Sequence, residues 1–254
     1  MSKYVKYNEC EVKINDKNIF ALNADLSAGT ASYSEALYGG ELGSYSSPSE
    51  LQATVSFEYY VTGEIDDIRL LTGDIPCSGE FGGISFSGAY LNNYSVKIEP
   101  YLPVTFSASF SIYSGYRNVL STGSFTSSSI DLANGAHTST SNITYGNVGL
   151  DNPQQIDFSI SCERKPNYII GSEYPQDVRY GSVDKKLSIR GEDIGSLINF
   201  SGRDIASVNI QPRTLNNISR GQLIACSGIV KSQALNVSKN GLVNGAIEIV
   251  ERVR

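Results

Sequence analysis

The sequence predicts an all-β protein with minor helical content, built from two tandem copies of one β-sandwich or barrel-like domain. Three observations support this prediction. Charged residues make up only 18% of the chain, so its polar surface comes mainly from Ser, Thr, Asn and Gly, a composition typical of short strands and turns. Sixteen Tyr and nine Phe favour pleated, half-buried surfaces. Finally, the same kinds of segment occur twice in the same order.

The first repeated segment is an alternating strand. Residues 23–27 (NADLS) correspond to residues 157–161 (DFSIS), and a turn-like stretch precedes each. Alternation with a period of two residues predicts a strand with one buried face. A Tyr-rich stretch punctuated by Gly and Pro follows in both halves, from Tyr33 to Ser49 and from Tyr168 to Val183. We expect these two stretches to form long loops that contact a partner.

The third repeated segment is a strand followed by a short helix. Residues 55–64 resemble residues 187–192, and each run ends in Gly-Glu. An Asp then opens a short helix with one apolar face, since Asp is a favoured N-cap. Gly73 and Gly202 are expected to end the two helices.

The fourth repeated segment is a β-hairpin, predicted from Tyr94 to Tyr113 and from Ala234 to Val250. Asn240-Gly241 is a strong hairpin-turn signal in the second copy. The repeats predict a first domain over residues 1–125 and a second over residues 126–254, joined by a Ser/Gly-rich linker at roughly 121–142.

Charge and hydropathy exclude several functions. The net charge is −6, which disfavours a protein that grips nucleic acid through its phosphates. Residues 1–127 carry 7 Lys/Arg and 14 Asp/Glu, whereas residues 128–254 carry 13 and 12, so the first half is acidic and the second balanced. No apolar run is long enough to span a bilayer, and no signal peptide is visible, so we expect synthesis in a cytoplasm.

Residues that could carry chemistry are scarce. His137 is the only histidine, and we expect it to be a solvated loop residue. The four cysteines, widely spaced, are expected to be reduced and buried. A carboxylate cluster around Glu64 and Asp67 could serve a glycosidase or bind a cation, although turn and capping roles explain it better. We therefore expect no enzyme activity, no cofactor and no metal site.

The order of strand, long loop, strand, short helix and hairpin resembles the tube domain of bacteriophage tails. The stretch from Ser227-Gly228 through Asn240-Gly241 to Ile249 is similar to the final hairpin of major tail proteins. This resemblance implies rings that stack into a DNA-conducting tube within the virion tail. Two domains per chain imply a trimer with pseudo-sixfold symmetry, which contacts itself and other tail proteins and does not bind DNA specifically. The roles of tube, baseplate hub, neck and terminator stay open.

The resemblance also implies two sets of assembly residues. The candidate contacts between rings are Tyr33, Tyr38, Tyr45, Tyr168, Tyr174 and Tyr180. The candidate barrel-hairpin residues are Val96, Ile98, Phe106, Phe110, Val237, Ile247 and Ile249.

The Tyr and Asn content supports an alternative function, that of a carbohydrate-binding adhesin or tail-fibre module. Tyrosines such as Tyr90 and Tyr113 could form a platform on which sugar rings stack. Large, rigid and amphipathic Tyr side chains are equally favoured at protein interfaces. Glycan affinity without ring formation would distinguish the adhesin from the tube protein.

Overall fold

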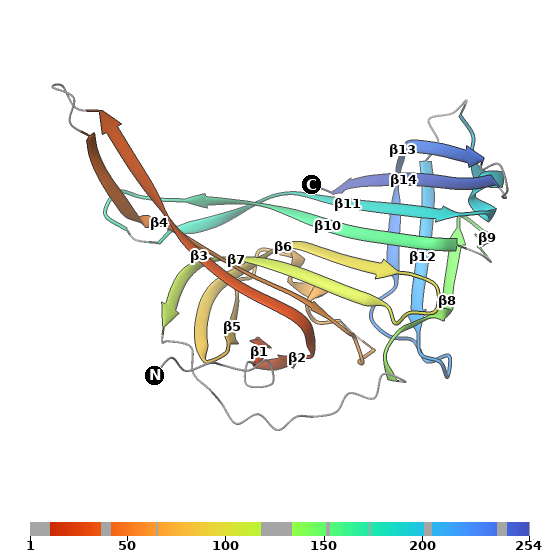
Figure 1. Cartoon of the computed structure of the whole chain (residues 1–254), viewed down its shortest axis with the longest axis horizontal. Helices are drawn as coiled ribbons and strands as arrows, with labels where there is room; N and C mark the ends of the chain where they lie inside the picture. Colours follow the sequence, from red (N-terminus) through yellow and green to blue (C-terminus); the bar gives the residue numbers. More distant parts are fainter. Residues whose placement is uncertain are drawn as a thin grey trace.

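The computed structural model describes residues 11–36, 42–64, 66–117, 134–150, 153–172, 174–200, 205–237 and 243–253. It confirms the all-β prediction: the described strands form one antiparallel sheet (Figure 1). The first seven strands are β1 (Val12–Ile14), β2 (Lys17–Ile19), β3 (Ala21–Ala36), β4 (Leu42–Tyr59), β5 (Cys77–Phe81), β6 (Ile84–Ile98) and β7 (Thr105–Arg117). The remaining seven are β8 (His137–Tyr145), β9 (Val148–Gly149), β10 (Pro153–Asn167), β11 (Asp177–Gly191), β12 (Ile205–Arg213), β13 (Ile224–Val237) and β14 (Val243–Val253).

The same pattern of strand pairing occurs twice in this sheet. The first seven strands pair in the order β2-β1-β5-β6-β7-β4-β3, and the last seven in the order β9-β8-β12-β13-β14-β11-β10. Strands β1 to β7 therefore correspond, in chain order, to strands β8 to β14, so that β3 matches β10 and β6 matches β13. We call these two sets of strands the first and second repeats. The expected boundary at residues 125 and 126 lies outside the described residues.

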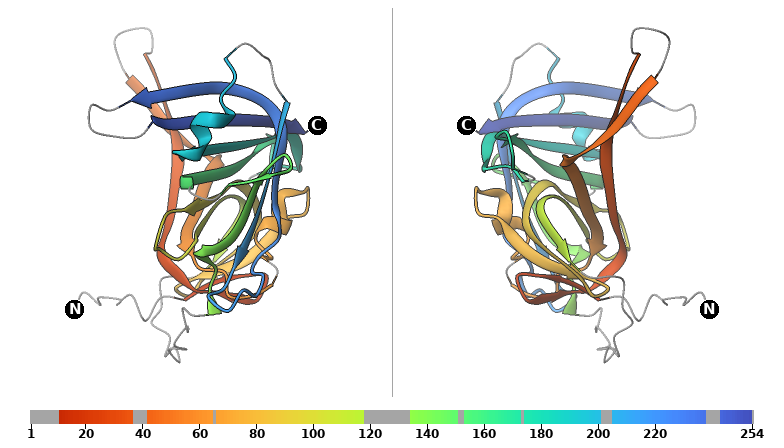
Figure 2. Two further views of the ribbon diagram at one scale, coloured as in Figure 1. Left: turned by 90° about the vertical axis from the view of Figure 1, so that its right-hand side faces the viewer. Right: turned by 90° about the vertical axis from the view of Figure 1, so that its left-hand side faces the viewer.

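The two repeats join edge to edge. Strand β6 pairs with β7 along one edge, while its other edge pairs with β5 near its start and with β10 near its end. The β10–β6 ladder runs from Ile156 opposite Ile98 to Ser161 opposite Asn93. One hydrophobic core extends through both repeats, and the sheet twists and curls around it (Figure 2).

Two expected features of the backbone are wrong. The predicted Tyr33–Ser49 loop is mostly strand, because β3 and β4 continue as a long antiparallel hairpin through residues 31–36 and 42–47. In the second repeat the strands also continue further than expected, and β11 already begins at Asp177. Ser, Thr and Tyr tolerate an extended, solvated backbone, so polar composition alone did not distinguish these strands from loops.

The short helices occur where expected but are 3₁₀ helices rather than α-helices. They are η2 (Arg69–Thr72) and η4 (Asp193–Leu197). Neither has a side-chain cap on its N-terminus. Gly73 ends η2 as predicted, whereas Gly202 lies outside the described residues. A Cβ atom on Gly245 would lie 2.6 Å from the Gly195 nitrogen, so the missing side chain in β14 allows η4 to pack closely against it.

Candidate assembly surfaces

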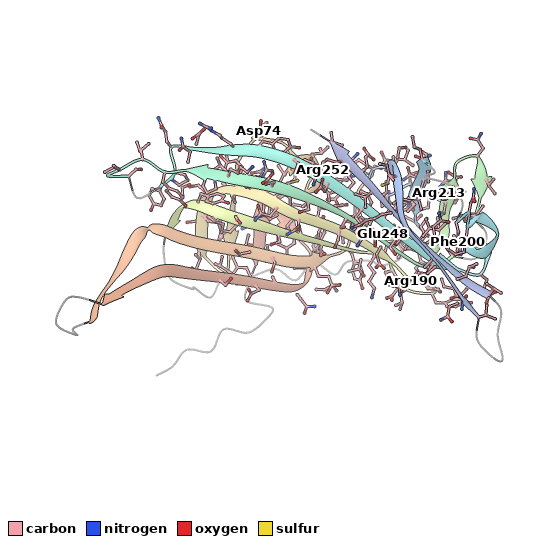
Figure 3. The ribbon with its side chains drawn as sticks, turned by 90° about the horizontal axis from the view of Figure 1, so that it is seen from above. Asp74, Arg190, Phe200, Arg213, Glu248 and Arg252 are labelled. Carbon is pink, nitrogen blue, oxygen red and sulfur yellow. The ribbon has the colours of Figure 1, made fainter. Side chains whose placement is uncertain are left out.

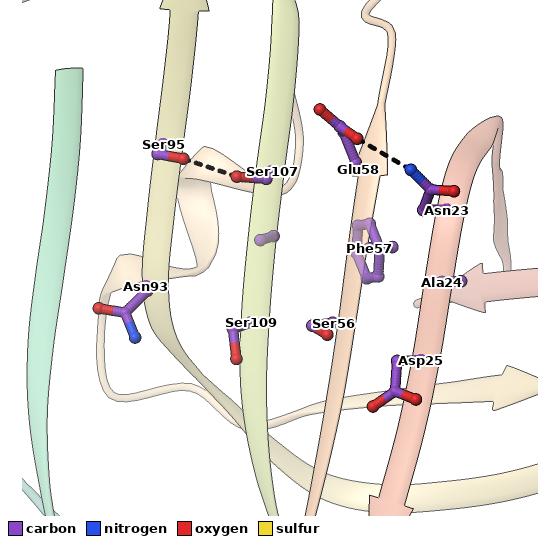
Figure 4. Close-up of a pocket in the computed structure, with 11 residues that line it drawn as sticks. Asn23, Ala24, Asp25, Ser56, Phe57, Glu58, Asn93, Ser95, Ser107 and Ser109 are labelled. Carbon is purple, nitrogen blue, oxygen red and sulfur yellow. Dashed lines mark hydrogen bonds between the residues drawn. The ribbon is translucent and has the colours of Figure 1, made fainter. Parts of the chain in front are cut away.

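The face of the sheet opposite the core is lined with hydroxyl groups. A row of directly paired positions crosses both repeats, from β3 through β4, β7, β6 and β10 to β11. Its side chains are Asn23, Glu58, Ser107, Ser95, Ser159 and Lys186. Two pairs in this row are hydrogen-bonded, with 2.6 Å between the Ser95 and Ser107 Oγ atoms and 3.1 Å from Asn23 Nδ2 to Glu58 Oε2 (Figure 4).

The first-repeat part of this polar face is hollowed. The hollow has a volume of about 440 Å³ and is open to solvent. Phe57 supplies the only aromatic ring among its lining residues, and it belongs to the buried core. A sugar-stacking platform needs an exposed ring, so this hollow does not have the form that the adhesin hypothesis expects. Its lining residues are Asn23, Ala24, Asp25, Ser56, Phe57, Glu58, Asn93, Ser95, Ser107, Ala108 and Ser109.

In the second repeat the polar face carries charges of both signs. Arg190 on β11 and Glu248 on β14 are labelled in Figure 3, and Glu248 forms ion pairs with Lys186 at 2.9 Å and Lys231 at 3.7 Å. Lys186 and Lys231 both lie against the Glu248 carboxylate, which weakens the positive field that these two lysines present to a polyanion.

The predicted hairpin residues lie in the two expected hairpins, but they do not share one environment. Six of them face the core, and only Val237 is exposed, with 68% of its surface accessible. The six core residues are Val96, Ile98, Phe106, Phe110, Ile247 and Ile249.

The predicted ring-contact tyrosines belong to two hairpins that project from the same end of the molecule, on the left in Figure 1. Tyr33 and Tyr45 are directly opposite each other in the β3–β4 hairpin, whereas Tyr38 lies outside the described residues. In the β10–β11 hairpin, Tyr174 is exposed, and so are Ile169 and Ile170 in the same connection between the strands. Tyr168 lies at the start of the same connection, just after the end of β10.

Tyr180 contributes to a clamp between the repeats that the sequence did not predict. The Arg164 guanidinium lies 5.1 Å from the centroid of the Tyr180 ring and 5.5 Å from that of Tyr90. Its Nη2 donates to the main-chain oxygens of Leu91 at 3.0 Å and Thr72 at 3.3 Å, so this second-repeat residue binds two carbonyls of the first repeat. The Arg164 side chain is 2% exposed.

A second inter-repeat contact surrounds a buried carboxylate. Asp66 accepts hydrogen bonds from the hydroxyls of Tyr59 at 2.8 Å and Tyr94 at 2.9 Å, and its main-chain oxygen accepts one from Gln222 of the second repeat. Burial raises the pKa of Asp66, and the two tyrosine hydroxyls partly oppose that shift. Burial also raises the pKa values of both tyrosines. Arg69 strengthens the contact by donating to the Leu223 carbonyl at 2.9 Å.

The carboxylates considered for catalysis do not converge. Asp66 points into the core, whereas Asp67 is exposed and forms an ion pair with Lys17 at 2.6 Å. Glu64 is also exposed. No group of three or more potential metal ligands occurs in the part of the chain that the structure describes.

The remaining reactive side chains have structural environments. Cys77, Cys162 and Cys226 are free and buried, as predicted, while Cys10 lies outside the described residues. Burial raises the pKa of Cys77 to about 12, which keeps it as a thiol. His137 begins strand β8 and pairs with Pro103 and Arg213, so it is not the loop residue that was expected. Among the described residues no helix is long and apolar enough to cross a membrane.

Comparison with known proteins adds no assignment: no protein-family model matches the chain, and no curated protein matches it significantly.

Proposed function

We propose that this chain is a structural subunit that self-assembles into rings and forms the tail tube of a bacteriophage, or its hub, as a conduit for DNA. The observation that carries this proposal is the β10–β6 ladder. Within one chain, two copies of the same strand arrangement associate edge to edge and extend a single sheet. A unit that pairs with its own repeat in this way is suited to pairing with further copies of itself.

The polar face supports the conduit role. It is continuous across the junction of the repeats, rich in serine and nearly balanced in charge along its central row. Such a surface would let a DNA duplex pass without the ion release that accompanies tight phosphate binding. The environments of the carboxylates and of His137 support a role without catalysis.

The projecting hairpins support stacking of rings. Ile170 is fully exposed in the connection between β10 and β11, and Tyr174 in the same connection is also exposed, so both provide apolar surface that a neighbouring ring would cover. In this proposal three chains form a pseudo-sixfold ring within the virion tail.

Negative-stain electron microscopy of the purified chain, with mass measured in solution, tests the proposal. We expect rings or tubes with a central hole wide enough for duplex DNA, and masses in multiples of three chains. A monodisperse monomer at high concentration would refute self-assembly. Glycan binding by that monomer would then favour the adhesin.

A further inference from the structure

Two long strand edges in the described part of the chain, one on β3 and one at the end of β13, have no partner strand. Among the described residues, β3 pairs only with β4. Strand β13 pairs with β12 only from Ile224 to Ile229, so residues 230–237 have no described partner along that edge. In the first repeat the corresponding part of β6 is occupied by β10, which is the counterpart of β3.

Irregularities in the ladders align the repeats residue by residue. The β3–β4 ladder shifts register just after Ala21, and the β10–β11 ladder shifts just after Pro153. The β6–β7 ladder shifts between Leu91 and Asn93, and the β13–β14 ladder has its shift between residues 230 and 232. Counted from these shared bulges, Leu26 in the first repeat is equivalent to Phe158 in the second. Their partners on the neighbouring strands, Val55 and Leu187, are equivalent as well.

The same alignment relates β6 to β13. Val96 lies opposite Phe106, and Leu235 lies opposite Gly245, at matching distances from the bulges. Within the chain, Phe158 of β10 pairs with Val96 of β6. Applied to the open edges, this register places Leu26 opposite Leu235.

The open edge of β13 has apolar side chains at the positions where β6 has buried ones, but on β13 these side chains are exposed to solvent. Val96 and Ile98 are 1% and 2% exposed, whereas their counterparts Leu235 and Val237 are 44% and 68% exposed. The opposing edge of β3 offers Leu26 and Ala24, which are only partly buried.

Building on the proposed function, we propose that β3 of one copy pairs antiparallel with the end of β13 of the next copy. The register is that of the junction within the chain, with Leu26 opposite Leu235, Ala24 opposite Val237 and Asp25 opposite Asn236. This contact joins two different edges, so it is heterologous and propagates from copy to copy until the ring closes. Main-chain hydrogen bonds join the strands, and the apolar pairs select the register.

The junction between chains lacks one element of the junction within the chain. Strand β3 contains no arginine, so nothing in it corresponds to Arg164 of β10. The contact between copies therefore has no buried guanidinium clamp. We expect the contact between copies to dissociate at protein concentrations and temperatures at which each chain stays folded.

Cysteine cross-linking tests the register. Ser27 and Ala234 are exposed, and they correspond to Ser159 and Ser95, which lie directly opposite each other within the chain. In a Cys10→Ser background, we expect Ser27→Cys/Ala234→Cys chains treated with oxidised glutathione to form covalent multimers on a non-reducing gel. Each single variant has one introduced, exposed thiol, since Cys77, Cys162 and Cys226 are buried, so it should form at most a covalent dimer and no higher multimers. The pair Ser27→Cys/Asn236→Cys, displaced by two residues, should cross-link poorly because its Cα atoms are too far apart.

The outcomes separate this inference from the proposed function. Rings seen by microscopy without the predicted cross-link, or with equal cross-linking of the displaced pair, would overturn the β3–β13 register and leave the tube intact. Absence of both rings and cross-links would overturn both. A Leu235→Asp variant adds a second measurement: we expect it to stay monomeric with an unchanged urea-unfolding transition, and rings formed by this variant would also overturn the inference.

Discussion

The end of β6 in the first repeat and the end of β13 in the second have the same strand position, the same bulge and the same apolar alternation, yet opposite environments. Val96 is buried beneath the junction with β10, whereas Leu235 lies at an open edge. The difference lies in what covers each strand, not in the strands themselves. The end of β6, which is paired with β10, thus shows the environment that the end of β13 would have if another strand paired with it.

The largest expected effect contrasts Ile98 with its counterpart Val237. Ile98→Ala should lower the free energy of unfolding by about 2–5 kcal/mol, because it removes buried methyl groups and leaves a cavity. Val237→Ala, at an exposed site, should change it by less than about 0.5 kcal/mol in the monomer. Urea unfolding of dilute protein measures both. Equal losses would mean that the end of β13 is already covered in the monomer.

The Arg164 clamp should come next in magnitude. Arg164→Ala leaves the partly buried carbonyls of Leu91 and Thr72 without this donor and removes a cation that contacts two aromatic rings. We expect a loss of about 3 kcal/mol in unfolding free energy. The matched control is Arg252→Ala, which removes an exposed ion pair to Asp184 and should have a much smaller effect on unfolding, because solvent screens that pair. Similar losses in the two variants would refute the clamp.

Asp66 should make stability depend on pH. Its folded pKa is raised above the ordinary value of 3.8, so the folded state holds the proton more tightly than the unfolded state. The stability of the wild-type chain relative to Asp66→Asn should therefore fall as pH rises from about 4 through the raised folded pKa. Urea titrations at several pH values measure this difference. A difference that is independent of pH would contradict the raised pKa.

The smallest effect on the fold is expected in the β10–β11 hairpin. Ile170 is fully exposed, so Ile170→Ser should leave unfolding unchanged within about 0.5 kcal/mol. In assembled samples it should shorten tubes or release single rings. Ile75→Ser, at a residue that is 76% exposed and does not belong to this hairpin, is the control. Tube lengths from electron microscopy decide the matter, and identical lengths in the two variants would remove Ile170 from the stacking contact.

Much of the local structure was predictable from the sequence. Alternation in residues 247–249 and 94–98 gave strands with the correct buried face, and the repeated blocks gave the order of elements. The sequence predicts a loop for residues 33–49, in the outer part of the β3–β4 hairpin, because that Ser-rich and Tyr-rich stretch has no apolar alternation. Arg164 donates to Leu91, 73 positions away, and the main-chain oxygen of Asp66 accepts from Gln222, 156 positions away. No local pattern in the sequence reveals such contacts.

The sequence by itself determined the fold class, the repetition and the side of each core strand that turns inward, because alternation and turn chemistry are local. Only the tertiary structure decided which edges are joined and which are open. Val96 and Leu235 are both apolar members of alternating strands, and nothing near them in sequence tells them apart. Backbone hydrogen-bonding groups are the same in every strand, so strand partners are set by the path of the whole chain.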